Sequence, residues 1–215
     1  MSSIFDDIIL NLNNEFNLKR KHPLMLISKT DARDVENKIA SCLQIHSNNV
    51  KYIKKSGLYN NIDGLVTHID NNIYLMIQTA DCMPIFMIDN IKGMIGLVHS
   101  GWKGTSNSII LSAISIFSNY GSRIDDIEIY IGPSIKSCCY EIKYDVAKYF
   151  NPKFIIKNNQ KSFLDLEKKV RYDLSEVGIK SSNIFISDIC TYENKNFCSY
   201  RRDNDKSGRM YSIIG

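Results

Sequence analysis

Two histidines and one cysteine, His46, Cys82 and His99, are the residues of this 215-residue sequence whose types and placement suit chemistry. Each adjoins a short apolar run, so we expect each at a strand end, where side chains can converge without disturbing a core. Two imidazoles and a thiolate form a ligand set that suits zinc, and three protein ligands leave a fourth position open for water or substrate. The spacing is too long for a zinc finger and contains no CxxC pair, so a hydrogen-bonded structural role stays open for each histidine.

The same residues permit two other chemistries. Without a metal, Cys82 would serve as a nucleophile with His99 as its base, as in a cysteine hydrolase or deamidase. A copper site with two histidines, one cysteine and Met83 as axial ligand is the second alternative, although its spacing is unusual for blue-copper proteins. A bound zinc ion would prevent the thiolate from acting as a nucleophile, so the metal content of the protein separates these hypotheses.

Short apolar strands must position these side chains. Apolar runs of strand length and β-branched composition occur at 23–28, 73–78, 84–89, 93–99 and 127–131. Several of them lack polar alternation, which is typical of strands that are covered on both faces.

Helices are predicted between and after these strands. An apolar stripe predicts a helix over 105–119, with Gly121 as its stop. A second stripe predicts a helix over 162–177, where Ser162 with Asp165 resembles a capping box and Gly178 suits the C-terminal end. Residues 31–40 form a weaker helical pattern.

Composition indicates one globular unit. A length of 215 residues with 44% hydrophobic content, without repeats or linkers, favours one mixed α/β domain over residues 1–215. The net charge of +4 is too mild and too scattered to indicate nucleic acid, and no apolar stretch approaches the ~18 residues of a membrane span. The start resembles no signal peptide, so we expect the six cysteines to be reduced thiols in the cytoplasm.

Six sequence motifs together resemble the YfiH-like laccase-domain family. They are QIH (44–46), DGLVT (63–67), TADCMPI (79–85), HSGWKG (99–104), IGPSIKSCCYEI (131–142), and SYRRD with SGR (199–203, 207–209). Proteins of this family were first labelled polyphenol oxidases and are regarded as purine nucleoside phosphorylases with adenosine deaminase activity. The resemblance implies an α+β fold, a single-domain mixed β-sheet sandwich flanked by helices.

The resemblance also implies that His46, Cys82 and His99 are zinc ligands and belong to the catalytic site. Asp81, beside Cys82, is a candidate to orient a ligand or to carry a proton, or else to cap a turn. Trp102 is a candidate to stack on a purine, or else to seal the core. Lys103, which stands where arginine is usual in the family, is a further candidate to bind substrate.

A basic cluster near the C-terminus, Arg201, Arg202, Lys206 and Arg209, suits an anion. The arginine fork matches phosphate oxygens, and phosphate is the second substrate of phosphorolysis. A solvated turn, with an arginine paired to Asp203, is the alternative.

The function implied by the resemblance is zinc-dependent phosphorolysis of adenosine, inosine, guanosine or methylthioadenosine, with deamination of adenosine. Zinc activates water, which suits attack on C6 of adenine. The expected partners are therefore purine nucleosides and phosphate, without nucleic acid or membrane, and the expected state is a monomer or small homo-oligomer. A multicopper oxidase would need more imidazoles than four histidines supply. A non-enzymatic role in cell-wall editing is the remaining alternative, which nucleoside turnover would exclude.

Overall fold

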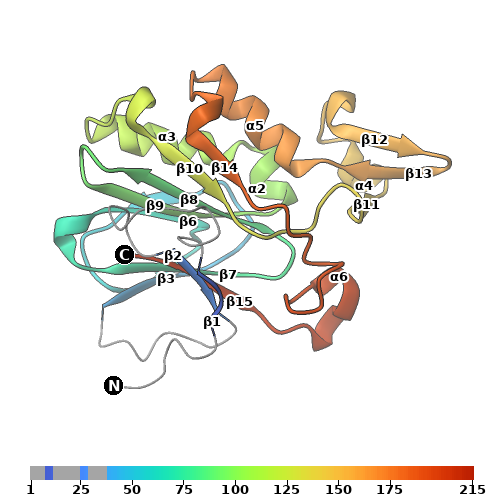
Figure 1. Cartoon of the computed structure of the whole chain (residues 1–215), viewed down its shortest axis with the longest axis horizontal. Helices are drawn as coiled ribbons and strands as arrows, with labels where there is room; N and C mark the ends of the chain where they lie inside the picture. Colours follow the sequence, from blue (N-terminus) through green and yellow to red (C-terminus); the bar gives the residue numbers. More distant parts are fainter. Residues whose placement is uncertain (1–7, 12–24, 29–37) are drawn as a thin grey trace.

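Two six-stranded sheets form the frame of the molecule, seen in a computed structural model that describes residues 8–11, 25–28 and 38–215 (Figure 1). The first sheet has the order β1 (Ile8–Asn11), β2 (Met25–Ser28), β15 (Met210–Ile214), β7 (Tyr74–Thr79), β3 (Ile39–Leu43) and β5 (Gly57–Asn60). The second sheet has the order β14 (Ile184–Ile186), β10 (Glu128–Ile131), β8 (Met83–Asp89), β9 (Met94–Ser100), β6 (Gly64–His68) and β4 (Val50–Tyr52). The two sheets together make the expected sandwich.

Helices and a small sheet flank this sandwich (Figure 1). The α-helices are α2 (Trp102–Ser106), α3 (Ile109–Asn119), α4 (Tyr144–Ala147), α5 (Leu166–Glu176) and α6 (Tyr200–Asp203). Short 3-10 helices occur at Ile69–Asn71, Ile124–Asp126, Pro152–Phe154, Ser181–Asn183 and Asn204–Lys206. The small sheet has the order β11 (Glu141–Ile142), β13 (Lys161–Leu164) and β12 (Ile155–Asn158). The α+β architecture expected from the sequence is confirmed.

The second sheet is buried on both faces. One apolar cluster, which includes Leu75 and Phe86, fills the space between the sheets. Another, which includes Val98, Phe117 and Leu174, lies between the second sheet and the helices α3 and α5. Every residue of β8 and β9 is buried as a result, which confirms why their sequences lack polar alternation.

All five predicted strands are present, but the predicted helices differ in their limits. The helix predicted over 105–119 is divided into α2 and α3, because Ser108 adopts a left-handed conformation with φ of 52°. Gly121 follows α3 with φ of +88°, and Gly178 follows α5 with φ of +89°, so both glycine stops are confirmed.

Two helix predictions were wrong in part. Ser162 lies in β13, and α5 begins only at Leu166, with the side chain of Asp165 accepting the backbone N–H of Lys168 at 2.9 Å. Asp165 is therefore the N-cap residue itself rather than the partner in a capping box. In the weak pattern at 31–40, residues 31–37 lie outside the described part of the chain, and Ile39 and the next residue belong to β3.

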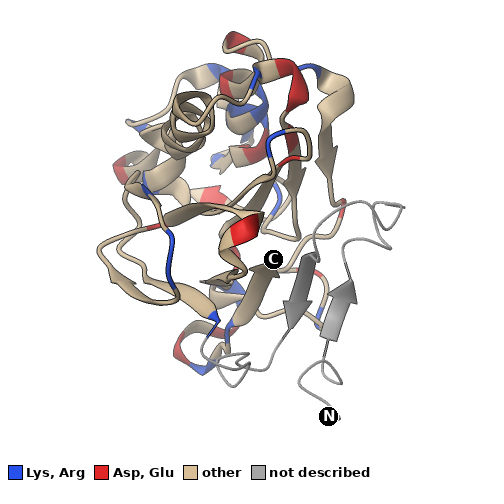
Figure 2. Ribbon diagram, turned by 90° about the vertical axis from the view of Figure 1, so that its left-hand side faces the viewer, with Lys and Arg blue, Asp and Glu red and all other residues tan. Residues whose placement is uncertain are grey.

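Charges of both signs are interspersed over the ribbon (Figure 2). Among the described residues, no helix combines the length and the apolar character needed to cross a membrane.

Candidate metal centre

The ligand atoms of His46, Cys82 and His99 all lie within 4.8 Å of one another. His99 lies near the end of β9, and the antiparallel register pairs it with Pro84 of β8. Cys82 lies in the link from β7 and directly precedes Met83, the first residue of β8. His46 follows β3 of the first sheet. The three side chains therefore meet at one end of the sandwich, where the two sheets join.

A buried carboxylate, that of Asp63, fixes both histidines and was not singled out from the sequence. Its Oδ1 atom accepts the Nδ1–H of His99 at 2.9 Å and the backbone N–H of His46 at 2.9 Å. Its Oδ2 atom accepts the backbone N–H and the hydroxyl of Ser47, both at 2.7 Å. Because Nδ1 of His99 carries its hydrogen toward this carboxylate, the Nε2 lone pair is left for a metal.

The charged forms of Cys82, His99 and Asp63 stabilise one another. Burial favours the neutral thiol, but the imidazolium of His99 and hydrogen bonds from both histidines lower the pKa of Cys82 to about 6. Burial likewise opposes the charge on His99, but the Cys82 thiolate and the Asp63 carboxylate raise its pKa to about 9. Asp63 is also buried, yet hydrogen bonds from His99 and Ser47 lower its pKa to about 2. Without a metal, the centre thus holds a thiolate–imidazolium pair at neutral pH.

Gly101 keeps the space beside the ligands open. A Cβ atom at this position would lie 2.9 Å from Sγ of Cys82 and 3.2 Å from Cδ2 of His46. The backbone of Gly101 has φ of −80° and ψ of 175°, which any residue adopts, so the requirement is for space. His46 is exposed while His99 is buried, so the centre opens to solvent on the His46 side. The donor set, the carboxylate behind His99 and this open side fit a zinc ion with one free position.

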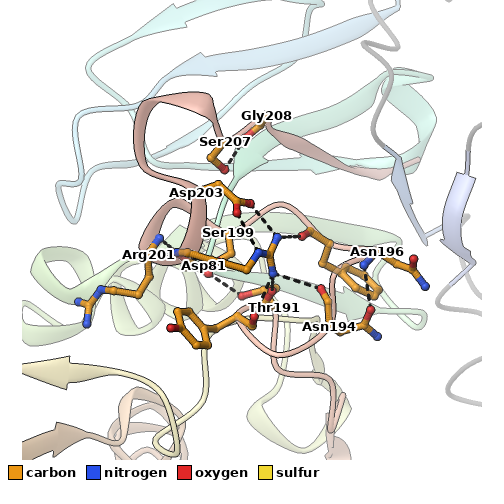
Figure 3. A network of polar contacts seen from close by, with 12 residues as sticks. Asp81, Thr191, Asn194, Asn196, Ser199, Arg201, Asp203, Ser207 and Gly208 are labelled. Atoms are coloured by element: carbon orange, nitrogen blue, oxygen red, sulfur yellow. Dashed lines mark hydrogen bonds and ion pairs between the residues drawn. The ribbon is translucent and has the colours of Figure 1, made fainter.

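Asp81 binds the 191–201 segment, as Figure 3 shows. Its Oδ1 atom accepts the hydroxyl hydrogen of Thr191 at 2.7 Å, and Oδ2 accepts the backbone N–H of Arg201 at 2.7 Å. Asp81 has φ of 81°, a left-handed conformation that is uncommon for a residue with a side chain. Asp81 therefore ties the residue before Cys82 to a distant loop, while the carboxylate that contacts a ligand belongs to Asp63.

The guanidinium of Arg202 is enclosed by protein oxygens. It donates to the carboxylate of Asp203 from Nε at 3.0 Å and from Nη2 at 2.8 Å. It also donates to four carbonyls, those of Thr191 at 2.8 Å, Tyr192 at 3.0 Å, Asn194 at 3.5 Å and Phe197 at 2.8 Å. An arginine side chain has five N–H groups, so each has an acceptor within the protein. Phosphate binding was expected of Arg202, but in the structure its hydrogen bonds hold together the preceding loop, residues 191–197.

Arg201 differs from its neighbour because its side chain is exposed. Its Nη1 atom donates to the carbonyl of Glu141 at 2.6 Å, and its guanidinium lies 5.0 Å from the ring centre of Tyr140. Burial and the nearby Cys82 thiolate raise the pKa of Tyr140, so its phenol stays neutral and can donate a hydrogen bond. In Arg209, which is also exposed, Nη1 donates to the carbonyls of Ser207 and Gly208 at 3.2 and 3.0 Å.

Trp102 begins α2, directly after Gly101. Its indole is partly buried against the apolar cluster beneath the helices, and its ring lies 5.6 Å from that of Tyr149. Lys103 is exposed and places its ammonium group 5.6 Å from the Trp102 ring. The indole thus packs on the core and keeps part of its surface accessible.

The sequence matches a family model described as multi-copper polyphenol oxidoreductase laccase over residues 25–215. The chain belongs to this laccase family. A relative named purine nucleoside phosphorylase, from Borreliella burgdorferi, is 33% identical over 220 residues, which cover 98% of this chain and 93% of the relative. A relative named adenosine deaminase RL5, from an unknown prokaryotic organism, is 32% identical over 162 residues, which cover 71% of this chain and 62% of the relative.

A solved structure of the Bacillus licheniformis hypothetical protein YfiH has the same fold. It aligns with a TM-score of 0.78 and 24% identity, covering 92% of this chain and 97% of that one. The family model and the relative of 33% identity confirm the resemblance to the laccase family, and the solved structure confirms the fold.

The described part of the chain offers few imidazoles for several copper ions. Of its histidines, only His68 lies outside the metal centre, and its Nδ1 atom accepts the backbone N–H of Asp70 at 3.1 Å. The fourth histidine, His22, lies outside the described residues.

Proposed function

We propose that the chain is a zinc-dependent purine nucleoside phosphorylase that also deaminates adenosine. The observation that carries this proposal is the convergence of His46, Cys82 and His99 with the Asp63 carboxylate behind one imidazole. The names of the relatives support the two reactions, and adenosine, inosine, guanosine and methylthioadenosine are the proposed nucleosides. We place the reaction in the cytoplasm, where thiols stay reduced.

Zinc is the proposed metal rather than copper. Two imidazoles and one thiolate with a free fourth position are typical of catalytic zinc sites. When bound, zinc supplies Lewis acidity that activates water or polarises a substrate atom. Asp63 holds the tautomer and orientation of His99, and Gly101 keeps the free position accessible.

The remaining residues bind and orient the substrates. Arg201 is the proposed phosphate contact, because its guanidinium is exposed and donates to the protein through Nη1, whereas the donors of Arg202 are all engaged. Trp102 is proposed to stack on the purine through its accessible surface, with Lys103 beside it. Tyr140, neutral and close to Cys82, can donate a hydrogen bond to a substrate oxygen or nitrogen.

One observation favours a second candidate function. The pKa of Cys82 is lowered to about 6 beside an imidazolium, which is also the arrangement of a cysteine hydrolase or deamidase that works without a metal. In that case a chelator would leave the activity intact, and a thiol-alkylating reagent would abolish it in the metal-free protein.

The decisive experiment is incubation of the zinc-loaded protein with adenosine, with and without phosphate, followed by identification of the products by mass. We expect free adenine and phosphorylated ribose only when phosphate is present, and inosine under both conditions. The chelated protein should form none of these products. Turnover that survives chelation would favour the cysteine hydrolase, and the absence of turnover with zinc would contradict an enzymatic role on nucleosides.

A further inference from the structure

A second group of metal-ligating side chains lies outside the candidate metal centre. The ligand atoms of Cys138, Cys139, Cys190 and Glu193 all lie within 4.8 Å of one another. They come from two loops, one after β10 and one after β14, and the sequence motifs assigned them no chemistry. Ser134 of the first loop forms a parallel bridge with Cys190, so the backbones of the two loops are held side by side.

The sulfur positions suit a tetrahedral site. Zinc–sulfur bonds of about 2.3 Å in a tetrahedron separate two sulfur atoms by about 3.8 Å. The sulfur atoms of Cys138 and Cys190 are 3.8 Å apart, and those of Cys138 and Cys139 are 3.2 Å apart. To bind one ion, the sulfur atoms of Cys138 and Cys139 would therefore need to move only slightly apart. Adjacent residues can reach one ion here because they lie in a turn, in which the backbone N–H of Cys139 donates to the carbonyl of Lys136 at 3.0 Å.

The surroundings stabilise a thiolate at Cys190. Burial disfavours its charge, but hydrogen bonds from the backbone N–H groups of Lys136, Glu193 and Tyr192 lower the pKa of this thiol. Hydrogen bonds of this kind support metal-bound thiolates.

An ion can reach this cluster from solvent. Cys138 and Glu193 are exposed, and an open depression of about 500 Å³ is lined by Cys190, Glu193 and the residues that follow it. Solvent therefore reaches the cluster at Cys138 and at the carboxylate, whereas Cys190 itself is buried.

We propose that Cys138, Cys139, Cys190 and Glu193 bind a second zinc ion through three sulfurs and one carboxylate oxygen. Four protein ligands leave no position for a substrate, so the role of this ion is structural. It would join the loop after β10 to the loop after β14.

The proposed ion is linked to the first metal centre through Asp81. Thr191, next to Cys190, donates to the Asp81 carboxylate at 2.7 Å, and the backbone N–H of Ile135 donates to the Asp81 carbonyl at 2.9 Å. Both loops therefore hold the residue that precedes Cys82. The second ion would position a ligand of the first centre without contact to either substrate.

Zinc content, measured on protein purified under reducing conditions, tests this proposal. We expect about two zinc ions per chain in the unaltered protein and about one each in Cys82→Ala and Cys138→Ser, with neither site filled when both changes are combined. Cys138 is exposed, so its replacement by serine should leave the fold intact, which thermal unfolding can verify. Cys198→Ser, which changes a thiol outside both clusters, should keep both ions.

Cobalt titration of metal-free Cys82→Ala protein gives a second readout that does not depend on enzymatic activity. We expect thiolate-to-cobalt charge-transfer absorption, with an affinity more than about 100-fold lower after Cys138→Ser, because loss of a direct ligand exceeds the usual cost of losing an outer hydrogen bond. If the Cys82→Ala protein binds neither zinc nor cobalt, the proposal is overturned, whether or not the first centre binds zinc in the unaltered protein. A disulfide between Cys190 and either neighbouring cysteine in anaerobically isolated, zinc-supplied protein would also overturn it.

Discussion

Oδ1 of Asp63 lies 2.9 Å from Nδ1 of His99, and the same oxygen accepts the backbone N–H of His46. His99 belongs to the second sheet, and His46 follows a strand of the first. One carboxylate therefore sets the ring orientation of one proposed metal ligand and the loop position of another. The geometry of the centre depends on this residue as much as on the ligands themselves.

Replacement of Asp63 by asparagine should weaken zinc binding at the first centre about 10- to 100-fold and reduce both nucleoside reactions, because His99 loses the acceptor that fixes its tautomer. Zinc competition with a chromophoric chelator measures this effect. Asp89→Asn is the matched control, since Asp89 is also buried and accepts backbone N–H groups at the other end of β8. Equal zinc affinities in the two variants would contradict the role assigned to Asp63.

Gly101→Ala should abolish tight zinc binding at the first centre while the fold is retained, which leaves only the ion proposed at Cys190. The added Cβ would meet Sγ of Cys82 at 2.9 Å, a distance that real Cβ atoms essentially never show, and the backbone of Gly101 imposes no conformational penalty on alanine. Circular dichroism and zinc analysis of the same preparation test this prediction. Gly208→Ala, whose Cβ would lie 3.3 Å from Sγ of Cys198, should keep its zinc. Full zinc occupancy in Gly101→Ala would show that the ligands meet elsewhere.

Arg201→Ala should reduce phosphorolysis about 10- to 150-fold and leave deamination largely unchanged, since loss of one charge-assisted contact costs about 1.5–3 kcal/mol. Both reactions should be assayed on one preparation, with phosphate varied. A parallel loss of both reactions would assign Arg201 to holding the loop and not to phosphate.

Arg202→Ala should behave differently from Arg201→Ala. Its removal leaves the carbonyls of Thr191 and Phe197 without their donor, so the melting temperature should fall and both reactions should decline together. A selective loss of phosphorolysis at unchanged melting temperature would instead show that Arg202 binds phosphate.

Zinc binding to the first centre should release about one proton per ion between pH 6 and pH 9. In this range Cys82, with its lowered pKa, is already a thiolate, while His99, with its raised pKa, must lose its proton to bind. The release should increase below pH 6, where Cys82 is also protonated, and decrease above pH 9. Calorimetry in buffers of different protonation enthalpy measures the number of protons released. The Cys138→Ser protein should be used, so that zinc fills only the first centre. No release near pH 8 would show that His99 is neutral before zinc arrives.

The strands were predictable from sequence because continuous apolar runs have few alternatives to a sheet that is buried on both sides. The limits of the helices were less predictable. Phe163 has the right spacing for the helical stripe of α5, but pairing of β13 with β12 places it in a strand, so tertiary contacts override the local pattern.

The convergence of His46, Cys82 and His99 could be proposed from residue type and motif order, whereas the residues that support them could not. Asp63 precedes a strand like many other acids, and its contact to His99 spans 36 positions of the chain. Its place in the DGLVT motif was the available signal. The cluster around Cys190 is less visible still, since its sulfur meets that of Cys138 across 52 positions through the pairing of two loops.

The place of β15 in the first sheet has a consequence for biosynthesis. β15 follows all the other described strands in chain order, yet it lies between β2 and β7, and β7 in turn pairs with β3, which leads to His46. While the ribosome is still making residues 210–214, β7 has an unpaired edge that is open to wrong partners. The candidate metal centre therefore acquires its complete frame only after translation has passed β15, and we expect zinc to bind late, after synthesis of the last described strand.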